Sequence, residues 1–281
     1  MISVGIVGAS GYTGEELARL LANHPNVELK SLTSKTHEGK EINTIFKLDE
    51  KIPGKFKSPQ VENLKDCDVV FFATPNGVAM NMANALIEQG IKVIDISADF
   101  RLTSAEQFTE WYEMNHSSPD LLHESVYGLP EMKGQREKIQ HAKLVANPGC
   151  YPTSILLPLI PLFKKKLIKF NNIIIDSKSG YSGAGRGVHK KYKDKNLYES
   201  LSAYGVGFHR HNSEIDQMLK KFTKKKFEFT FTPHLSPMFR GILSTIYVEL
   251  ETNVSQSNIL NSLNNFYKKE NFVKILKVDS L

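Results

Sequence analysis

The first 25 residues constrain the fold more than any other part of this 281-residue chain. A short apolar run from Ile2 to Val7 is followed by Gly8, Gly11 and Gly14, and then by a helical pattern of leucines. This order of strand, glycine turn and helix is typical of a dinucleotide site, because glycine lets the backbone approach a pyrophosphate at the positive end of the helix. The sequence therefore predicts a nucleotide-binding unit at the N-terminus.

The alternation of strands and helices continues beyond this unit. Residues 68–74 and 91–97 have the composition of buried strands, and residues 76–90 that of a helix ended by Gly90. Strands that alternate with helices predict an α/β fold with a Rossmann-type, doubly wound parallel sheet. Ligands bind at the carboxyl ends of such strands, which points to Thr74 and Pro75 and to the loop from 97 to 101.

The end of the second predicted strand, residues 27–33, bears on the choice of cofactor. An NAD site usually offers an acidic residue to the ribose 2′-hydroxyl near this position. Here the chain reads Ser34-Lys35-Thr36, with no acid. A hydroxyl and a cation suit a 2′-phosphate, so NADP(H) is favoured over NAD, with ordinary loop residues as the alternative.

Cys150 stands in an unusual frame for a cysteine that only packs. It lies between Pro148-Gly149 and Tyr151-Pro152, ahead of an apolar run that predicts a helix with proline in its first turn. A thiol at a helix N-terminus has a lowered pKa and a larger thiolate fraction. A lone cysteine is more often a core residue, and Cys67, in the acidic turn KDCDVV, is interpreted as structural. The frame makes Cys150 the candidate nucleophile.

A thiolate nucleophile usually works with a histidine. The densest histidine segment, residues 207–219, contains His209, Arg210 and His211. Such a cluster can supply a base and a cation for an anionic substrate, and a charged helix entry without a function is the alternative. The His-x-His spacing without a partner motif is a weak metal signal, so no metal is predicted.

A helix is expected to follow this histidine cluster. Asn212 or Ser213 is the expected N-cap, and Glu214 then lies in the first turn as an orienting carboxylate.

The loop SGYSGAGRG, residues 179–187, follows an apolar strand pattern. It can wrap an anionic or amide ligand with its backbone amides, and a flexible connector is an equally good interpretation. With this loop included, the predicted cofactor-binding residues are Gly8, Ser10, Gly11, Tyr12, Thr13, Gly14, Ser34, Lys35, Thr74, Pro75, Ser182 and Gly183.

The composition limits the classes of function. No apolar run reaches the roughly 18 residues of a membrane span, and the N-terminus has no signal-peptide pattern. Two distant cysteines make no disulfide framework, so we expect a cytoplasmic protein that binds no membrane. The net charge of +6 comes mainly from scattered lysine clusters that are not interleaved with aromatic residues. Solvated helix ends explain these clusters better than nucleic-acid binding does.

Several segments, in order from residue 4 to about residue 242, resemble one family closely. They are GIVGASGYTGEELARLL, DISADFRL, YGLPE, ANPGCYPTS, SGYSGAGR, HRHNSEI and PMFRGIL. The combination of ANPGCYPTS with HRHNSEI is the most specific. The chain resembles the N-acetyl-γ-glutamyl-phosphate reductases of arginine biosynthesis, which are related to the aspartate-semialdehyde dehydrogenases.

The resemblance implies an NADP-dependent oxidoreductase that acts on a small-molecule acyl phosphate. The Cys150 thiolate would attack N-acetyl-L-glutamyl 5-phosphate and expel phosphate, and NADPH would reduce the thioester to N-acetyl-L-glutamate 5-semialdehyde. His209 would be the acid–base partner. The implied architecture is an NADP-binding Rossmann-like domain at 1–149 and an α+β catalytic and dimerisation domain at 150–281, in a homodimer or homotetramer.

The same resemblance suggests where the substrate binds. Arg101, in the ADFR loop, is the candidate for holding the phosphate, because a guanidinium binds such oxygens bidentately. Arg210, His211 and Glu214 would line the acylated amino-acid end, and Arg240 is a further candidate. The predicted substrate-binding residues are Arg101, Asn147, Ser179, Arg210, His211 and Glu214.

The sequence departs from the family pattern in two places. Asn76 stands where members commonly carry histidine, and nothing in the chain matches the family's C-terminal segment, which we expect to be missing. An inactive NADP-binding remnant is therefore one alternative. A related reductase of aspartyl phosphate, or of a carrier-linked acyl phosphate of lysine synthesis, is the other, since such enzymes would share the cysteine chemistry.

Overall fold

The computed structural model describes residues 1–46, 52–186 and 199–277. No helix in these ranges is both long enough and apolar enough to cross a membrane. In the same ranges, no group of three or more histidine, cysteine, aspartate or glutamate side chains is placed to hold a metal ion.

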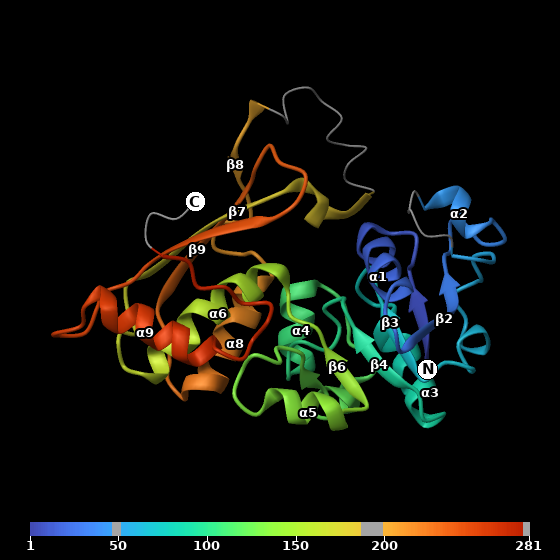
Figure 1. Ribbon diagram of the computed structural model, residues 1–281, viewed down its shortest axis with the longest axis horizontal. Coiled ribbons are helices and arrows are strands. Elements are labelled where there is room, and N and C mark those ends of the chain that lie inside the picture. Colours follow the sequence, from blue (N-terminus) through green and yellow to red (C-terminus); the bar gives the residue numbers. More distant parts are fainter. Residues whose placement is uncertain (47–51, 187–198, 278–281) are drawn as a thin grey trace. The chain divides into compact units, whose positions relative to one another are not determined.

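The chain forms two compact units. Unit 1 comprises Met1–Pro130, Gly134–Pro148 and a short segment that begins at Ala184. Unit 2 comprises Glu131–Lys133, Gly149–Gly183 and the C-terminal part of the chain. Each unit is built on a sheet of its own (Figure 1).

Unit 1 contains a six-stranded parallel sheet with the strand order β2-β1-β3-β4-β6-β5 (Figure 1). Its strands are β1 (Ile2–Val7), β2 (Val27–Thr33), β3 (Val69–Phe72), β4 (Lys92–Asp95), β5 (Val126–Tyr127) and β6 (Leu144–Ala146). Its helices are α1 (Tyr12–Ala22), α2 (Ile42–Ile45), α3 (Ala79–Glu88), α4 (Ala105–Tyr112) and α5 (Gln135–His141), with 3₁₀ turns η1 (Val61–Asn63) and η2 (Pro119–Leu122).

Both faces of this sheet are covered by helices. Successive side chains of a strand point to opposite faces, and here the two faces feed two separate apolar clusters. Ile6 packs in the cluster that contains Ala18 of α1. Val70 and Phe72 pack in the cluster that contains Ala83 of α3. The predicted doubly wound parallel sheet is therefore confirmed.

The strand order reverses at β1, which has β2 on one side and β3 on the other. In a parallel sheet, the loops after two such neighbouring strands leave from the same edge and form a crevice. The glycine turn after β1 and the Thr74-Pro75 turn after β3 are these loops. The topology thus brings together two segments that the sequence analysis assigned to the cofactor.

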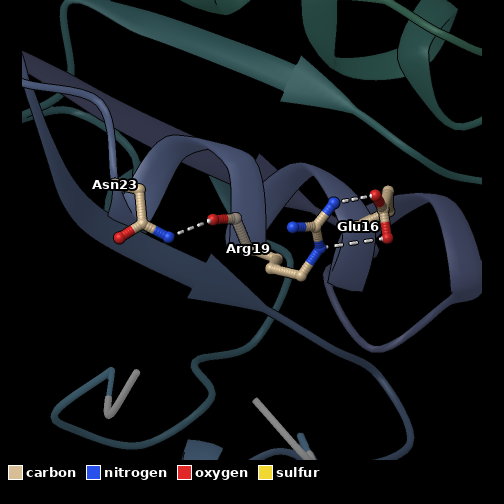
Figure 2. Close-up of polar contacts among 3 residues, drawn as sticks. All are labelled: Glu16, Arg19 and Asn23. Atoms are coloured by element: carbon tan, nitrogen blue, oxygen red, sulfur yellow. Dashed lines mark hydrogen bonds and ion pairs between the residues drawn. The ribbon is translucent and has the colours of Figure 1, made fainter. Parts of the chain in front are cut away.

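Helix α1 carries its polar contacts on its exposed side. Figure 2 shows Arg19 paired with Glu16, one turn earlier, and the Asn23 side chain donating to the Arg19 carbonyl oxygen at 3.3 Å. Exposed pairs of this kind contribute only about 0–1 kcal/mol. The helix is therefore held mainly by its buried side, where Gly14 and Ala18 lie against the sheet.

Unit 2 contains a four-stranded mixed sheet with the order β10-β7-β9-β8. Its strands are β7 (Ile173–Ser179), β8 (Ser202–Ala203), β9 (Phe229–Leu235) and β10 (Ile242–Tyr247). Its helices are α6 (Cys150–Lys164), α8 (His211–Thr223) and α9 (Gln256–Tyr267), with the 3₁₀ turn η3 (Tyr181–Ala184). Helix α6 packs against α8, α9 and β10 (Figure 1), as an α+β domain requires.

The start of α3 differs from the prediction, which began the helix at residue 76. Gly77 has a φ of 92°, which is outside the helical region. The carboxylate of Asp99 accepts hydrogen bonds from Gly77 N at 2.9 and 3.0 Å and from Met80 N at 3.0 Å. A side chain 22 residues away in sequence therefore caps this helix.

The predicted N-cap of α8 is wrong. The helix begins at His211, and Arg210, not Asn212 or Ser213, occupies the N-cap position. The amide of His211 donates to Nδ1 of His209 at 3.1 Å. An imidazole thus satisfies the first helical amide, which is the task that capping rules assign to serine, threonine, aspartate or asparagine.

We predict that Gly14→Ala destabilises the ligand-free protein by about 1–3 kcal/mol, the usual cost of forcing extra atoms into a packed site. A Cβ there would lie 2.5 Å from the Gly8 carbonyl oxygen and 2.6 Å from Ala9 Cα. Gly11→Ala is the matched control, because its Cβ would come no closer than 3.4 Å. Gly11→Ala should lower the free energy of unfolding by less than about 1 kcal/mol, because it weakens only the N-cap of α1. Equal melting temperatures for the two variants in thermal unfolding would contradict this packing.

Candidate active site

The glycine turn between β1 and α1 leaves no room for side chains at two of its positions. Gly8 has a φ of 79°, and a Cβ there would lie 2.5 Å from the Ala73 carbonyl oxygen. Gly14 is equally restricted by the Gly8 carbonyl oxygen. At Gly11, the N-cap of α1, the structure describes no side-chain cap. The turn therefore presents a bare, positively polarised helix start, which fits a pyrophosphate.

Serine hydroxyls join this turn to the end of β2. Ser10 Oγ lies 2.7 Å from Ser34 Oγ, which in turn lies 3.3 Å from Thr36 Oγ1. Ser34 is buried, whereas Lys35 beside it is exposed. The predicted residues Ser10, Ser34 and Lys35 are thus placed at one corner of unit 1, with hydroxyl groups and a cation that suit a ribose phosphate.

Thr74 supplies a second sign that this crevice fits a ligand. Its Oγ1 is buried and has no hydrogen-bond partner among the described residues. Its Cγ2 lies 3.0 Å from the position that a Cβ on Gly8 would take. Buried hydroxyls are almost always hydrogen-bonded, so an unsatisfied one beside the glycine turn suits a polar ligand there. The hydroxyl groups of Ser10 and Ser34 with neighbouring Lys35 are called the serine corner below. Together, the uncapped start of α1, the serine corner and Thr74 fit a dinucleotide.

The glycine turn has a neighbour that the sequence analysis did not assign. The guanidinium of Arg186 lies over the Tyr12 ring, 4.5 Å from its centroid, and pairs with Glu15. Arg186 belongs to the SGYSGAGR segment, and this motif was the one sequence feature that could have marked it as a residue of the site. The structure places the cation beside the start of α1.

The loop after β4 is organised by buried carboxylates. Asp95 Oδ1 accepts from Ser97 N at 2.8 Å and from Ser97 Oγ at 2.6 Å, and Oδ2 accepts from Phe100 N at 3.3 Å. Burial, followed by the nearby charge of Asp99, raises the pKa of Asp95 to about 6. These bonds hold the loop that carries Arg101.

Arg101 is buried and is tied to backbone carbonyl groups. Its Nε donates to the Asn147 carbonyl oxygen at 2.8 Å, and its Nη2 donates to the Ile96 carbonyl oxygen at 2.8 Å. The structure thus brings two predicted substrate residues together, and Arg101 links the loops that follow β4 and β6. These contacts show at least a structural task for this guanidinium.

Cys150 is the first residue of α6 and is exposed. Gly149 before it is extended, with φ −63° and ψ 155°, and its carbonyl oxygen accepts from Thr153 N and Thr153 Oγ1, each at 2.9 Å. The thiol therefore stands at the amide end of a well-formed helix, where a thiolate is stabilised.

Cys67 is a contrasting case. It is buried, and burial raises the pKa of its thiol to about 11. Its interpretation as a structural cysteine agrees with this environment, because a buried thiol of high pKa is unreactive.

Glu214 contacts the turn that carries the nucleophile. The side chain is fully buried, and its Oε1 accepts a hydrogen bond from Gly149 N at 2.9 Å. The sequence analysis assigned Glu214 to the substrate, whereas this bond shows that it anchors the residue before Cys150. Charge-assisted bonds of this kind are about twice as strong as neutral ones.

His209 lies in an aromatic pocket of unit 2. Its ring centroid is 5.4 Å from that of Tyr151, 5.5 Å from that of Tyr204 and 5.6 Å from that of Phe231. The residue that follows Cys150, the predicted nucleophile, is therefore a direct neighbour of the predicted acid–base histidine.

The protonation state of His209 follows from its surroundings. Burial, followed by the charge of Arg210, lowers the pKa of His209 to about 4. A backbone amide can only donate, so the bond from His211 N leaves Nδ1 unprotonated. The ring is therefore neutral near pH 7, with its proton on Nε2.

The remaining predicted residues also lie in unit 2. Ser179 is buried at the end of β7, and its Oγ donates to the Gly180 carbonyl oxygen at 3.4 Å. Arg210 is exposed at the start of α8, beside the partly buried His211. Ser182 N donates to the Phe239 carbonyl oxygen at 2.9 Å. Ser182 and Gly183 thus belong to a different unit from the other predicted cofactor residues.

Comparisons with known proteins agree with this arrangement. The profile of the family described as "Semialdehyde dehydrogenase, NAD binding domain" matches residues 3–142, and "Semialdehyde dehydrogenase, dimerisation domain" matches residues 150–281. The fold resembles aspartate semialdehyde dehydrogenase II of Vibrio cholerae, with a TM-score of 0.69 and 16% identity over 94% of this chain and 79% of that one. It also resembles the Candida albicans aspartate semialdehyde dehydrogenase solved with NADP, with a TM-score of 0.65 and 17% identity over 96% and 76%.

Curated relatives are much more similar in sequence. An N-acetyl-gamma-glutamyl-phosphate reductase of Acinetobacter baumannii strain SDF is 49% identical over all of this chain and 81% of its own length. The enzyme of that name from Nitrosomonas eutropha is 46% identical over the same shares. That from Thiobacillus denitrificans is 45% identical over 98% of this chain and 80% of its own. The chain therefore belongs to the semialdehyde dehydrogenase family and, within it, to the N-acetyl-gamma-glutamyl-phosphate reductases.

Proposed function

We propose that this chain reduces N-acetyl-L-glutamyl 5-phosphate to N-acetyl-L-glutamate 5-semialdehyde and phosphate, with NADPH as the reductant, in arginine biosynthesis. The observation that carries this proposal is the exposed Cys150 thiol at the amide end of α6, in a chain of this family. The backbone before this thiol is anchored by Glu214, so the nucleophile is held in place before the substrate binds.

Cys150 is the residue that forms and breaks covalent bonds. Its thiolate attacks the acyl carbon, a C–S bond forms, and the C–O bond to phosphate breaks with its electron pair leaving on phosphate. A nicotinamide cofactor, held by the glycine turn and the neighbouring residues named below, would supply a hydride to the acyl carbon. The C–S bond then breaks, its electron pair returns to sulfur, and the net proton of the reaction is taken up by the released phosphate.

His209 is the proposed acid–base partner, and its tautomer makes its role more specific. The proton on Nε2 is available to donate toward the substrate oxygen, which carries negative charge while the acyl carbon is tetrahedral. A donor that is already oriented in a dry pocket stabilises such an oxyanion more than water does. The thiolate itself is stabilised by the α6 amides and needs no base from this ring at neutral pH.

Arg101, Asn147, Ser179, Arg210, His211 and Glu214 are proposed to position the substrate. Arg101 and Asn147 lie together and are proposed for the phosphate. Arg210 is an exposed cation at the start of α8 and suits the carboxylate of the acylated amino acid. Glu214 is proposed to act on the substrate through Gly149 and the nucleophile turn.

The proposed cofactor is NADP(H), held by the glycine turn, Tyr12, Thr13, Thr74, Pro75, Ser182 and Gly183. The serine corner with Lys35 supports a 2′-phosphate, because it offers hydroxyl donors and one cation and contains no acidic side chain. Arg186, beside the start of α1, adds positive charge near the pyrophosphate position.

Residues 1–149 are proposed as the NADP-binding domain and residues 150–281 as the catalytic and dimerisation domain, working as a homodimer or homotetramer. The outer face of the mixed sheet suits self-association, because Ile174, Leu243 and Tyr247 are exposed on neighbouring strands. A cytoplasmic location is also proposed, since both cysteines are free thiols, as in a reducing compartment.

The decisive experiment runs the reaction backwards. With N-acetylglutamate semialdehyde, NADP and phosphate, we predict that NADPH forms and that Cys150→Ser lowers kcat by about three orders of magnitude or more, since a hydroxyl is a far weaker nucleophile than a thiolate. Absorbance at the reduced-nicotinamide band reports the rate. Cys67→Ser is the matched control and should keep wild-type turnover.

Two further arms of this assay decide the substrate. Omitting phosphate should stop NADPH formation after about one equivalent per site, because phosphate must attack the thioester to free Cys150 for the next turnover. Aspartate semialdehyde should be turned over far more slowly than the acetylated substrate. Turnover that survives in Cys150→Ser, or that needs no phosphate, would rule out the proposed chemistry.

We predict that Lys35→Glu raises the KM for NADP by about tenfold or more, the value of one lost charge-assisted bond. The KM for NAD should fall or stay constant, because NAD lacks the phosphate that the new carboxylate repels. Lys30→Glu is the matched control, since it makes the same charge change at an exposed position of β2. Equal changes for both cofactors in Lys35→Glu would count against 2′-phosphate recognition at this corner.

A further inference from the structure

The residue after the nucleophile is built into the pocket of His209. Tyr151 is buried in the first turn of α6. Its ring makes edge-on contacts with His209 and with Phe231, with centroids 5.4 and 5.2 Å away. Any movement of the histidine ring therefore changes the packing of the first turn of the nucleophile helix.

Tyr204 forms another wall of the same pocket. It follows β8, and its main-chain amide donates to the Pro233 carbonyl oxygen at 3.0 Å. Its ring centroid lies 5.5 Å from that of His209, and its hydroxyl lies 2.8 Å from the Tyr151 hydroxyl. The side chain is 39% exposed, so this wall is partly in contact with solvent.

The segment between Tyr204 and His209 has few other anchors. Val206 and Phe208 are 52% and 74% exposed. Gly205 has a φ of 57°, and a Cβ there would lie 3.3 Å from the His209 side chain. Among the described residues, the hydroxyl bond from Tyr204 to Tyr151 is thus the last side-chain contact with the first turn of α6 before the chain reaches His209.

We propose that Tyr204 is a positioning residue, and that its hydroxyl bond to Tyr151 holds the His209 ring against the first turn of the nucleophile helix. The hydroxyl pair links the start of α6 to the segment before α8. The kinetic part of this inference rests on the proposed function.

Removing one oxygen atom tests the proposal. Tyr204→Phe keeps the ring beside His209 and deletes only the hydroxyl bond. It should lower kcat in the reverse assay by about tenfold or more, since small misplacements of a reacting group cost up to about a hundredfold. The KM for NADP should stay constant. Tyr151→Phe should have the same effect, and the double variant should be no slower than either single one, because both lose the same bond.

Tyr267→Phe is the matched control. Its hydroxyl donates to the Leu157 carbonyl oxygen of α6, so this variant also loses a tyrosine hydrogen bond to the same helix. It should lower the melting temperature and leave kcat unchanged. A Tyr204→Phe kcat within twofold of wild type, or additive effects of the two pocket variants, would overturn the proposal.

A second readout does not depend on activity. Histidine ring resonances of the folded protein report the titration of His209, assigned with His209→Asn. Tyr151, Tyr204, Arg210 and His211 are the titratable or charged groups that face this ring. In Tyr204→Phe, the titration midpoint should move from about 4 toward the ordinary value of about 6.5, because the loosened ring gains water.

This readout separates failure of the proposed function from failure of the positioning proposal. A wild-type protein that shows no turnover refutes the function, and the resonance shift in Tyr204→Phe then still tests the hydroxyl pair. An unchanged midpoint in Tyr204→Phe overturns the positioning proposal even if wild-type turnover is normal.

Discussion

The chemistry proposed for this chain depends on one hydrogen bond, from Gly149 N to the buried carboxylate of Glu214. A buried charge is costly unless it is hydrogen-bonded, so the carboxylate and the turn fix one another. The bond holds the backbone immediately before Cys150 and joins the starts of α6 and α8. Without this bond, the Gly149 amide would lose its partner, and the backbone that positions the Cys150 thiol would be less well fixed.

The parts of the fold that were predicted from sequence are those with short-range causes. β1 and β2 have the predicted bounds, because β1 is ended by Gly8 and β2 lies between Pro25-Asn26 and Ser34, which are local turn signals. The glycine turn was also predicted, since its three glycines lie close together in sequence between the strand and the helix, although Gly8 is restricted by the distant Ala73 carbonyl oxygen. The helix start at Cys150 was also predicted, because its frame of proline and glycine is local.

The parts that were missed have long-range causes. α3 is capped by Asp99, which lies in the loop after β4, so no local rule could place the first turn of this helix. α8 begins two residues earlier than capping by Asn212 would give, and three earlier than capping by Ser213, because an imidazole accepts its first amide. Tyr204 belongs to none of the sequence motifs, and its contact with Tyr151 supports the positioning role proposed for it. Local motifs therefore predicted where Cys150 and His209 lie, whereas contacts between segments far apart in the sequence could not be predicted from them.

His209 is proposed to take part in the reaction, and its ring also accepts the first amide of α8. Protonation of this ring at low pH would therefore affect the fold as well as the reaction. An imidazolium has no lone pair on Nδ1, so protonation would replace the bond from His211 N by a contact between two donors. Glu214 lies three residues further along the same helix and holds the turn before Cys150. The folded-state pKa of His209 is depressed, so this ring contributes stability at neutral pH that decreases as the pH falls below its ordinary value of about 6.5. Acid conditions would therefore loosen the start of α8 and, through Glu214, the anchor of the nucleophile.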